Sequence, residues 1–323
     1  MRAAMTGKTI RQVMVKWAFR GAVLLLLVAA GAAAGVLYGW TQVARGLPAL
    51  QGWHTQAPAS EFRASDAKPG YDFEAYRRQE SRVFDELDQL VSGPWAGEAR
   101  GRFNRFSAAS ACNPATLFDT NWNRTFVLEP PAPAGGALLI HGLSDAPYSL
   151  RAVAERLRAE GFTVIGLRVP GHGTSPAALA TASLEDWTAA VRVAAVGLRS
   201  RIPAGAPLVI VGYSNGGALG VNYALESLAD VSLPRPQAIV LFSPMIGITP
   251  MATVTWLHRP IAALSGEPRA DWASLDAEVD PFKYGAWPMN ASVQAWQMTR
   301  QVDRGLAETA RAGRAAELPP ILA

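Results

Sequence analysis

The chain of 323 residues contains one cysteine, Cys112, and four histidines. A single cysteine excludes an intramolecular disulfide and any metal site built on cysteine pairs, and it is more often a small buried residue than a nucleophile. Nucleotide-binding glycine loops, paired-carboxylate sites and metal-ligand motifs are also missing from the sequence. We therefore expect neither a cofactor nor a metal ion.

Acidic residues are absent from the first twenty positions, although the whole chain has a net charge of only +4. The basic residues of this tail are Arg2, Lys8, Arg11, Lys16 and Arg20. Because the remainder is close to neutral, the positive charge reflects the tail and does not favour nucleic acid as a partner. With 50% hydrophobic residues, the chain can bury a large core.

Residues 21–40 form an uncharged apolar run that is long enough to cross a bilayer as a helix. The basic tail, residues 1–20, predicts a cytoplasmic N-terminus and a domain on the outer side, periplasmic or extracellular. The alternative is a signal peptide cleaved near Ala32–Ala34. We favour an uncleaved single-pass membrane anchor, because apolar residues continue past that site.

Residues 41–120 are predicted to connect the anchor to the main domain. Residues 47–70 are rich in proline, alanine, glycine and serine, which is typical of a linker. A helix is expected from Asp72 until Gly93 and Pro94 end it, with an apolar face that packs on the main domain.

From residue 121 to 323, short apolar runs alternate with helical ones, a pattern that predicts an α/β domain. Strands are expected at 121–128, 137–140, 162–167, 208–211, 238–242 and 318–322. Helices are expected at 148–160 and 184–198, after Ser214, and in a long segment that Asn290 could cap. The fold class is therefore a mostly parallel sheet with helices on both faces.

The alternation stops over about 245–288, a stretch rich in aromatic residues and methionine. It follows a core strand, where a loop over the carboxyl edge of the sheet would lie. Two interpretations remain: an ordinary packed excursion, or a small cap insertion that forms an apolar acyl pocket.

The strand 208–211 leads into Gly212-Tyr213-Ser214-Asn215-Gly216, a G-x-S-x-G pattern followed by a helical segment. Strand, tight turn and helix with a serine at the apex predict a nucleophile elbow, in which side chains at Gly212 and Gly216 would clash. The competing interpretation is a helix start with Ser214 as its capping residue. Acyl transfer would also need an oxyanion hole, to which Asn215 can supply one backbone N–H and the loop after strand 137–140 a second.

Three motifs in this order carry a family resemblance: HGLSDAPYS at 141–149, VPGHGTS at 169–175 and GYSNGG at 212–217. The chain resembles the serine α/β-hydrolases of the monoacylglycerol lipase, lysophospholipase and serine aminopeptidase group. The resemblance covers about residue 137 to the end and implies an α/β-hydrolase fold with Ser214 as nucleophile. It also implies an oxyanion hole from the N–H groups of Leu143 and Asn215.

The resemblance gives His141, Gly142 and His172 loop-shaping roles. In this fold the catalytic acid and histidine follow the serine in the sequence. Only His258 follows Ser214, and it lies in the cap-like stretch. The sequence is thus interpreted either as a C-terminally truncated fragment of a hydrolase, which we favour, or as a degenerate protein. We expect the 323-residue chain to hydrolyse a p-nitrophenyl ester poorly.

The leading hypothesis is a membrane-anchored serine esterase acting on a small-molecule ester or lipid, such as an acylglycerol or lysophospholipid. A serine peptidase or thioesterase of the same fold is also compatible with the resemblance. A non-catalytic binding or scaffold protein at the membrane is the alternative from another class, because the acid and base are not identified.

Overall fold

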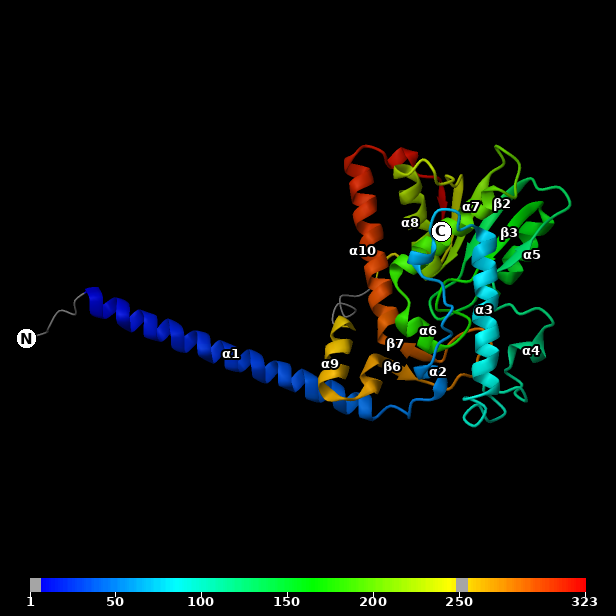
Figure 1. Cartoon of the computed structure of the whole chain (residues 1–323). Coiled ribbons are helices and arrows are strands. Elements are labelled where there is room, and N and C mark those ends of the chain that lie inside the picture. Colours follow the sequence, from blue (N-terminus) through cyan, green and yellow to red (C-terminus); the bar gives the residue numbers. More distant parts are fainter. Residues whose placement is uncertain (1–6, 248–254) are drawn as a thin grey trace, which may run out of the picture. The chain divides into compact units, whose positions relative to one another are not determined.

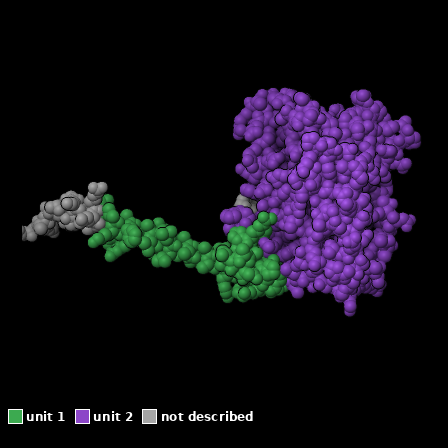
Figure 2. All heavy atoms as spheres, viewed as in Figure 1, with its two compact units in different colours: residues 1–47, 258–270 green, residues 48–257, 271–323 purple. Residues whose placement is uncertain are grey.

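The computed structural model describes residues 7–247 and 255–323 (Figure 1), and its side chains from residue 14 onward. The chain divides into two units (Figure 2). The smaller unit comprises residues 1–47 and 258–270, and the larger one residues 48–257 and 271–323.

The larger unit is built on a six-stranded sheet with the strand order β1-β3-β2-β4-β5-β8. The strands are β1 (Phe126–Leu128), β2 (Gly135–Ile140), β3 (Phe162–Leu167), β4 (Leu208–Tyr213), β5 (Ala238–Phe242) and β8 (Ile321–Leu322). Neighbouring strands run parallel except for β1, which pairs antiparallel with β3 at the edge. The predicted α/β class and mostly parallel sheet are therefore confirmed.

Helices cover both faces of this sheet (Figure 1). They are α3 (Phe73–Ser92), α5 (Arg151–Ala159), α7 (Leu184–Arg199), α8 (Asn215–Ala229) and α10 (Met289–Arg311). Side chains of β2 alternate between the two faces: Leu138 and Ile140 pack toward α7 and α8, whereas Ala137 and Leu139 pack toward α5. Each fully buried Leu or Ile stabilises the fold by about 1.5–3 kcal/mol.

Shorter elements complete the larger unit. They are α2 (Gly52–Thr55), α4 (Pro114–Leu117) and α6 (Pro176–Thr181), the 3₁₀ turns Ala64–Asp66, Pro147–Leu150 and Ala315–Glu317, and the hairpin of β6 (Trp272–Leu275) and β7 (Ala286–Pro288). A further 3₁₀ turn, Pro268–Asp271, belongs to the smaller unit except for its last residue.

Two local predictions differ from the structure. The helix expected at 148–160 is a 3₁₀ turn followed by α5. Asn290 does not cap α10, whose N-cap is Pro288. Asn290 is instead buried in the first turn, where its Nδ2 donates to the carbonyl oxygens of Leu179 and Ala182 at 3.1 and 2.8 Å. It thereby ties α10 to α6.

The segment 47–70, predicted to be a linker, packs from residue 48 onward within the larger unit. Trp53 and Phe62 are buried, the latter in the main core. Helix α3 begins as predicted, with Asp72 accepting a hydrogen bond from the N–H of Ala75. It buries Tyr76, Val83 and Phe84, so residues 48–92 form part of the α/β unit.

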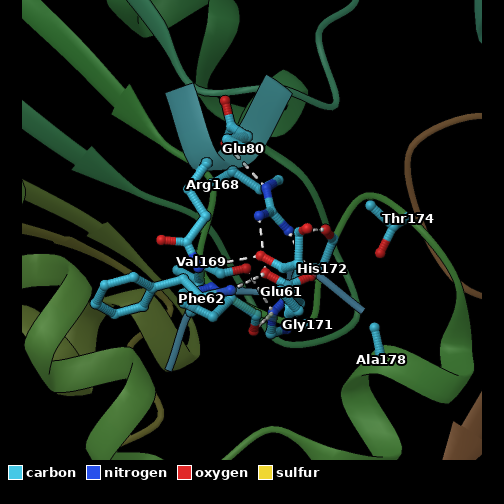
Figure 3. Close-up of polar contacts among 12 residues, drawn as sticks. Glu61, Phe62, Glu80, Arg168, Val169, Gly171, His172, Thr174 and Ala178 are labelled. Carbon is cyan, nitrogen blue, oxygen red and sulfur yellow. Dashed lines mark hydrogen bonds and ion pairs between the residues drawn. The ribbon is translucent and has the colours of Figure 1, made fainter. Parts of the chain in front are cut away.

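A buried ion network joins this segment to the sheet (Figure 3). Arg168, which follows β3, donates to both oxygens of Glu61 at 2.8 and 3.0 Å and to Glu80 on α3 at 2.9 Å. Its Nη1 also donates to the carbonyl oxygen of His172 at 3.0 Å. Thr125 donates to Glu80 through its N–H and its hydroxyl. Each guanidinium nitrogen and each carboxylate oxygen of the network therefore takes part in at least one hydrogen bond, as buried charges require.

The smaller unit contains α1 (Gly7–Arg45) and α9 (His258–Ser265). Trp40 Nε1 donates to the carbonyl oxygen of Ala270 at 3.2 Å, and Arg269 donates to that of Leu47 at 2.9 Å. Residues 258–270 of the expected cap insertion therefore pack against the C-terminal end of α1. Residues 248–254 of that insertion lie outside the described residues.

We predict that Arg168→Met lowers the free energy of unfolding by about 3–5 kcal/mol, because Glu61 and Glu80 would keep buried charges without a cation. Urea denaturation in detergent micelles would measure this. Arg156→Met is the control, since Arg156 pairs with Glu160 on the exposed side of α5 and should change stability by less than about 0.5 kcal/mol. Equal effects of the two substitutions would contradict the assigned importance of the network.

Candidate active site

The sheet topology brings the loops after β2 and β4 together. These strands are parallel neighbours, with Ile140 opposite Gly212. The chain runs from β2 to β3 on one side of β2 and then crosses to β4 on the other side. Such a reversal of strand order creates a crevice at the carboxyl edge, where ligands bind in open α/β sheets. Residues 141–144 and Ser214 leave the sheet at this point.

The turn after β4 has the geometry of a nucleophile elbow. Ser214 lies at the turn with φ 52° and ψ −116°, a region that non-glycine residues occupy at a cost of about 1–3 kcal/mol. Helix α8 begins at the next residue, Asn215. The strained turn is fixed by backbone hydrogen bonds: the Ser214 N–H donates to Phe242 O at 3.0 Å, and Ser214 O accepts from Gly217 and Met245.

Glycines let three backbone segments approach each other around this turn. A Cβ atom at Gly216 would lie 2.0 Å from the carbonyl oxygen of Ile140. A Cβ atom at Gly212 would lie 2.5 Å from the carbonyl oxygen of Gly216. Both positions therefore exclude side chains, which is the role that the pattern predicted for them.

The capping interpretation of Ser214 does not agree with the structure. Ser214 occupies the N-cap position of α8, but its hydroxyl makes no capping hydrogen bond to the helix. A capping serine typically accepts a hydrogen bond from the N–H two or three residues later. The half-buried hydroxyl is thus not used to stabilise the helix.

The loop after β2 lies directly against Ser214. A Cβ atom at Gly142 would be 3.3 Å from Ser214 Cβ and 3.1 Å from the ring of Tyr213. Leu143 follows in this loop and is nearly buried. Among the described residues, neither the N–H of Leu143 nor the N–H of Asn215 donates a turn or loop hydrogen bond to a backbone carbonyl. As the first residue of α8, Asn215 has no intrahelical acceptor for its N–H, so both groups are suitable oxyanion donors.

His141 and His172 are committed to the loops that they belong to. His141 Nε2 accepts from the N–H of Val169 at 3.0 Å, so its Nδ1 carries the proton and donates to Gly142 O at 2.8 Å. His172 Nδ1 lies 3.1 Å from Pro170 O and 3.2 Å from Val169 O. Burial lowers the pKa of His172 to about 4 and that of His141 well below its ordinary value. Both rings are therefore neutral at pH 7.

The other two histidines lie elsewhere in the chain. His54 is in α2, where its Nδ1 accepts from the N–H of Gln51 at 2.9 Å and burial lowers its pKa to about 4. His258 is buried in α9 of the smaller unit. In residues 7–247 and 255–323, no group of three or more His, Cys, Asp and Glu side chains is arranged to hold a metal ion.

Sequence reasoning did not identify Ser144 and Tyr284 as parts of this site. Ser144 adopts φ 60°, and its buried Oγ has no hydrogen-bond partner among the described residues. Its carbonyl oxygen accepts from the N–H of Tyr284 at 2.8 Å, and the Tyr284 hydroxyl donates to Gly171 O at 3.1 Å. Tyr284 thus joins the loop at 141–144 to the loop at 169–175. No local pattern marks it, because it lies in the aperiodic stretch.

The mostly parallel sheet and the elbow at Ser214 are those of the α/β-hydrolase class. The sequence profile described as serine aminopeptidase, S33, matches residues 131–299, more than half of the chain. The chain therefore belongs to this family, which confirms the predicted resemblance and fold.

Individual relatives are matched over shorter stretches. A thermostable monoacylglycerol lipase from Bacillus sp. (strain H-257) is 33% identical over 96 residues, which is 30% of this chain and 37% of the relative. The chain thus spans little more than a third of the length of that curated relative.

Two solved structures are also similar. A metagenome-derived lipolytic enzyme has 26% identity and a TM-score of 0.44, covering 57% of this chain and 71% of its own. A monoacylglycerol lipase from Paleococcus ferrophilus has 16% identity and a TM-score of 0.44, covering 61% and 86%.

We predict that Gly216→Ala lowers the free energy of unfolding by about 1–3 kcal/mol or more, because the added methyl group would displace the end of β2. Thermal unfolding of the purified protein would measure this. Gly97→Ala is a matched control, since a Cβ atom there meets nothing within 4 Å. A fully stable Gly216→Ala variant would contradict the close approach of the elbow to β2.

Proposed function

We propose that the protein is a membrane-anchored serine hydrolase that cleaves carboxylic esters through an acyl-enzyme on Ser214. The observation that carries this proposal is the position of Gly142 against Ser214 Cβ, which brings the loop with Leu143 to the nucleophile. Among the described residues, the Ser214 hydroxyl makes no capping hydrogen bond and the N–H groups of Leu143 and Asn215 make no turn or loop backbone hydrogen bond. A serine hydroxyl and two N–H donors that remain available are what acyl transfer requires.

In the proposed reaction, Ser214 Oγ attacks the ester carbonyl carbon as its proton is removed by a general base. The carbonyl oxygen becomes an oxyanion that accepts hydrogen bonds from the N–H groups of Leu143 and Asn215. The tetrahedral intermediate then expels the alcohol, which receives a proton, and leaves the acyl group on Ser214. Water hydrolyses this ester in a second step of the same kind and releases the carboxylic acid.

His141 and His172 have structural roles in this proposal. His141 connects the loop after β2 to the N–H of Val169, and His172 fixes the turn at 169–172. Both histidines are neutral and fully buried, and both use Nδ1 in contacts with backbone carbonyl oxygens. Neither is proposed as the general base.

The proposed substrates are small-molecule or lipid esters, with acylglycerols and lysophospholipids as the favoured class. The name of the monoacylglycerol lipase to which 96 residues of the chain are 33% identical supports this choice. Residues 258–270 of the cap-like stretch support it as well, since they pack on the apolar helix α1 in the smaller unit. A serine peptidase or a thioesterase remains the alternative within the same fold.

We also propose that α1 is a single-pass anchor with a cytoplasmic N-terminus. Within residues 14–45 of α1, an 18-residue stretch has a mean hydropathy of 2.2, and the side chains from Leu24 to Leu27 are exposed. A helix with so many exposed apolar side chains is stabilised by a lipid environment. In this arrangement the end of α1 brings residues 258–270 to the membrane surface, where a lipid ester would be encountered.

The nucleophile can be tested with a fluorophosphonate probe, which forms a covalent adduct with activated serines. We predict that the protein expressed from its own gene is labelled in its native membranes, and that Ser214→Ala abolishes labelling. Ser200→Ala, at an exposed position after α7, should label like the wild type. Labelling of Ser214→Ala would contradict the assigned nucleophile, and no labelling of the folded wild type would favour the scaffold function.

The topology can be tested at the lone cysteine, which is partly exposed and free. We predict that a membrane-impermeant maleimide labels Cys112 from the outer side of intact cells or spheroplasts. In a Cys112→Ser background, Thr9→Cys places a thiol in the basic tail and should be labelled only after the membrane is permeabilised. The opposite pattern would overturn the proposed orientation.

A further inference from the structure

A buried hydroxyl on α3 contacts the backbone just after β3. Tyr76 is 1% exposed, and its O–H donates to the carbonyl oxygen of Arg168 at 2.6 Å. Burial raises the pKa of Tyr76 well above its ordinary value, so the hydroxyl keeps its proton and acts as a donor. Helix α3 precedes residues 131–299, the region that the family profile matches. The donor therefore comes from outside that region.

The carbonyl group that Tyr76 contacts belongs to the peptide group between Arg168 and Val169. A trans peptide group is planar, and its C=O and N–H point in opposite directions. The N–H of Val169 donates to Nε2 of His141 at 3.0 Å. Tyr76 and His141 thus bind this peptide group from its two sides and fix its direction.

The imidazole of His141 connects this peptide group to the loop after β2. Because Nε2 accepts from Val169, Nδ1 carries the proton and donates to the carbonyl oxygen of Gly142 at 2.8 Å. The N–H of Asp145 reaches the same oxygen at 3.4 Å, a longer contact. The Gly142 carbonyl shares a peptide group with the N–H of Leu143, so this N–H points away from His141.

Four donors in this series point along the chain of hydrogen bonds in one direction. They are, in order, Tyr76 O–H, Val169 N–H, His141 Nδ1–H and Leu143 N–H. Hydrogen bonds in such a series polarise one another, so each donor is strengthened when its own group accepts a bond. The His141 ring also packs edge-on against the ring of His172, with 5.0 Å between the centroids. Its orientation is therefore fixed by packing as well as by hydrogen bonds.

We propose that Tyr76 is a positioning residue that acts on the N–H of Leu143 through this series of hydrogen bonds, which we call the Tyr76 relay. The hydroxyl of Tyr76 orients and strengthens the donor that the oxyanion would meet. This inference rests on the proposed function, because Leu143 is an oxyanion donor only if Ser214 attacks an ester. It adds to that function a residue of α3, a helix outside the matched family region.

The alternative is that Tyr76 only satisfies a buried carbonyl oxygen, and a second tyrosine separates the two interpretations. Tyr223 on α8 is also 1% exposed, and its O–H donates to the carbonyl oxygen of Pro234 at 2.7 Å. Tyr76→Phe and Tyr223→Phe therefore each remove one buried hydroxyl that donates to a backbone carbonyl oxygen. Both should lower the free energy of unfolding by a similar amount, whereas Tyr76→Phe alone should affect the relay.

The first measurement is the rate at which a fluorophosphonate labels Ser214 in native membranes, with the protein expressed from its own gene. Complete loss of an oxyanion donor slows acyl transfer by about 10²–10³-fold, and a donor that is weakened but still present should have a smaller effect. We expect Tyr76→Phe to slow labelling about threefold to tenfold. Tyr223→Phe should label at the wild-type rate.

The second measurement is an NMR spectrum of the 323-residue protein in detergent micelles, with isotope-labelled histidine. The chain has four histidines, and the signals of His141 are those that His141→Asn lacks. We expect the neutral Nδ1–H form of His141 in the wild type. Tyr76→Phe should move this Nδ1 proton upfield, because its hydrogen bond becomes weaker, and Tyr223→Phe should leave it unchanged.

A third variant should have the opposite effect on the same proton. A ring-fluorinated tyrosine at position 76 keeps the hydroxyl and makes it a stronger donor, so the Nδ1 proton of His141 should move downfield. Because it removes no hydrogen bond, this variant also tests the relay if Tyr76→Phe does not fold.

Three results would overturn the proposal. They are an Nδ1 proton of His141 that none of the changes at Tyr76 moves, labelling of Tyr76→Phe at the wild-type rate, and equal slowing of labelling by Tyr76→Phe and Tyr223→Phe. A folded wild type that is not labelled at all would contradict the proposed function instead, and the histidine spectra would then decide whether the relay exists.

Discussion

The contact between the elbow and the end of β2 is the constraint on which the proposed site depends. Gly216 approaches Ile140 O so closely that no other residue fits, and this approach is possible only because β2 and β4 are neighbours in register. The same contact sets the position of the loop that begins at His141. Strand pairing thus places Ser214, the proposed nucleophile, beside the loop that carries Leu143, and the strained φ of Ser214 is held by the surrounding backbone.

The charged network around Arg168 extends this arrangement to the N-terminal part of the chain. Arg168 follows β3 and donates a hydrogen bond to the carbonyl oxygen of His172. Because Arg168 also pairs with Glu61 and Glu80, these two carboxylates help to fix the loop at 169–175. Residues 48–92 are therefore a support of the α/β unit. The loop at 169–175 is thus stabilised by Glu61 and Glu80, two residues that precede the matched family region, 131–299.

The strands and helices that depend on a local pattern of apolar residues could be predicted from the sequence. The strands 162–167 and 238–242 have the expected bounds because short apolar runs between breakers have few alternatives. It did not predict the burial of Glu61, Glu80 and Arg168, since charged residues are normally exposed and their partners lie up to 107 positions apart. The packing of residues 48–70 was missed for the same reason: proline-rich composition indicates irregular backbone but does not reveal what covers it. Tyr284 was missed because its contacts, too, are distant in sequence.

The central claim is that Ser214 attacks a carbonyl whose oxygen is held by Leu143 and Asn215. A crystal structure of the protein after reaction with a phosphonate ester tests this most directly. The account predicts a phosphorus–Ser214 Oγ bond and a phosphonyl oxygen about 2.7–3.1 Å from the N atoms of Leu143 and Asn215. An adduct on another residue, or a phosphonyl oxygen directed away from both N–H groups, would contradict it.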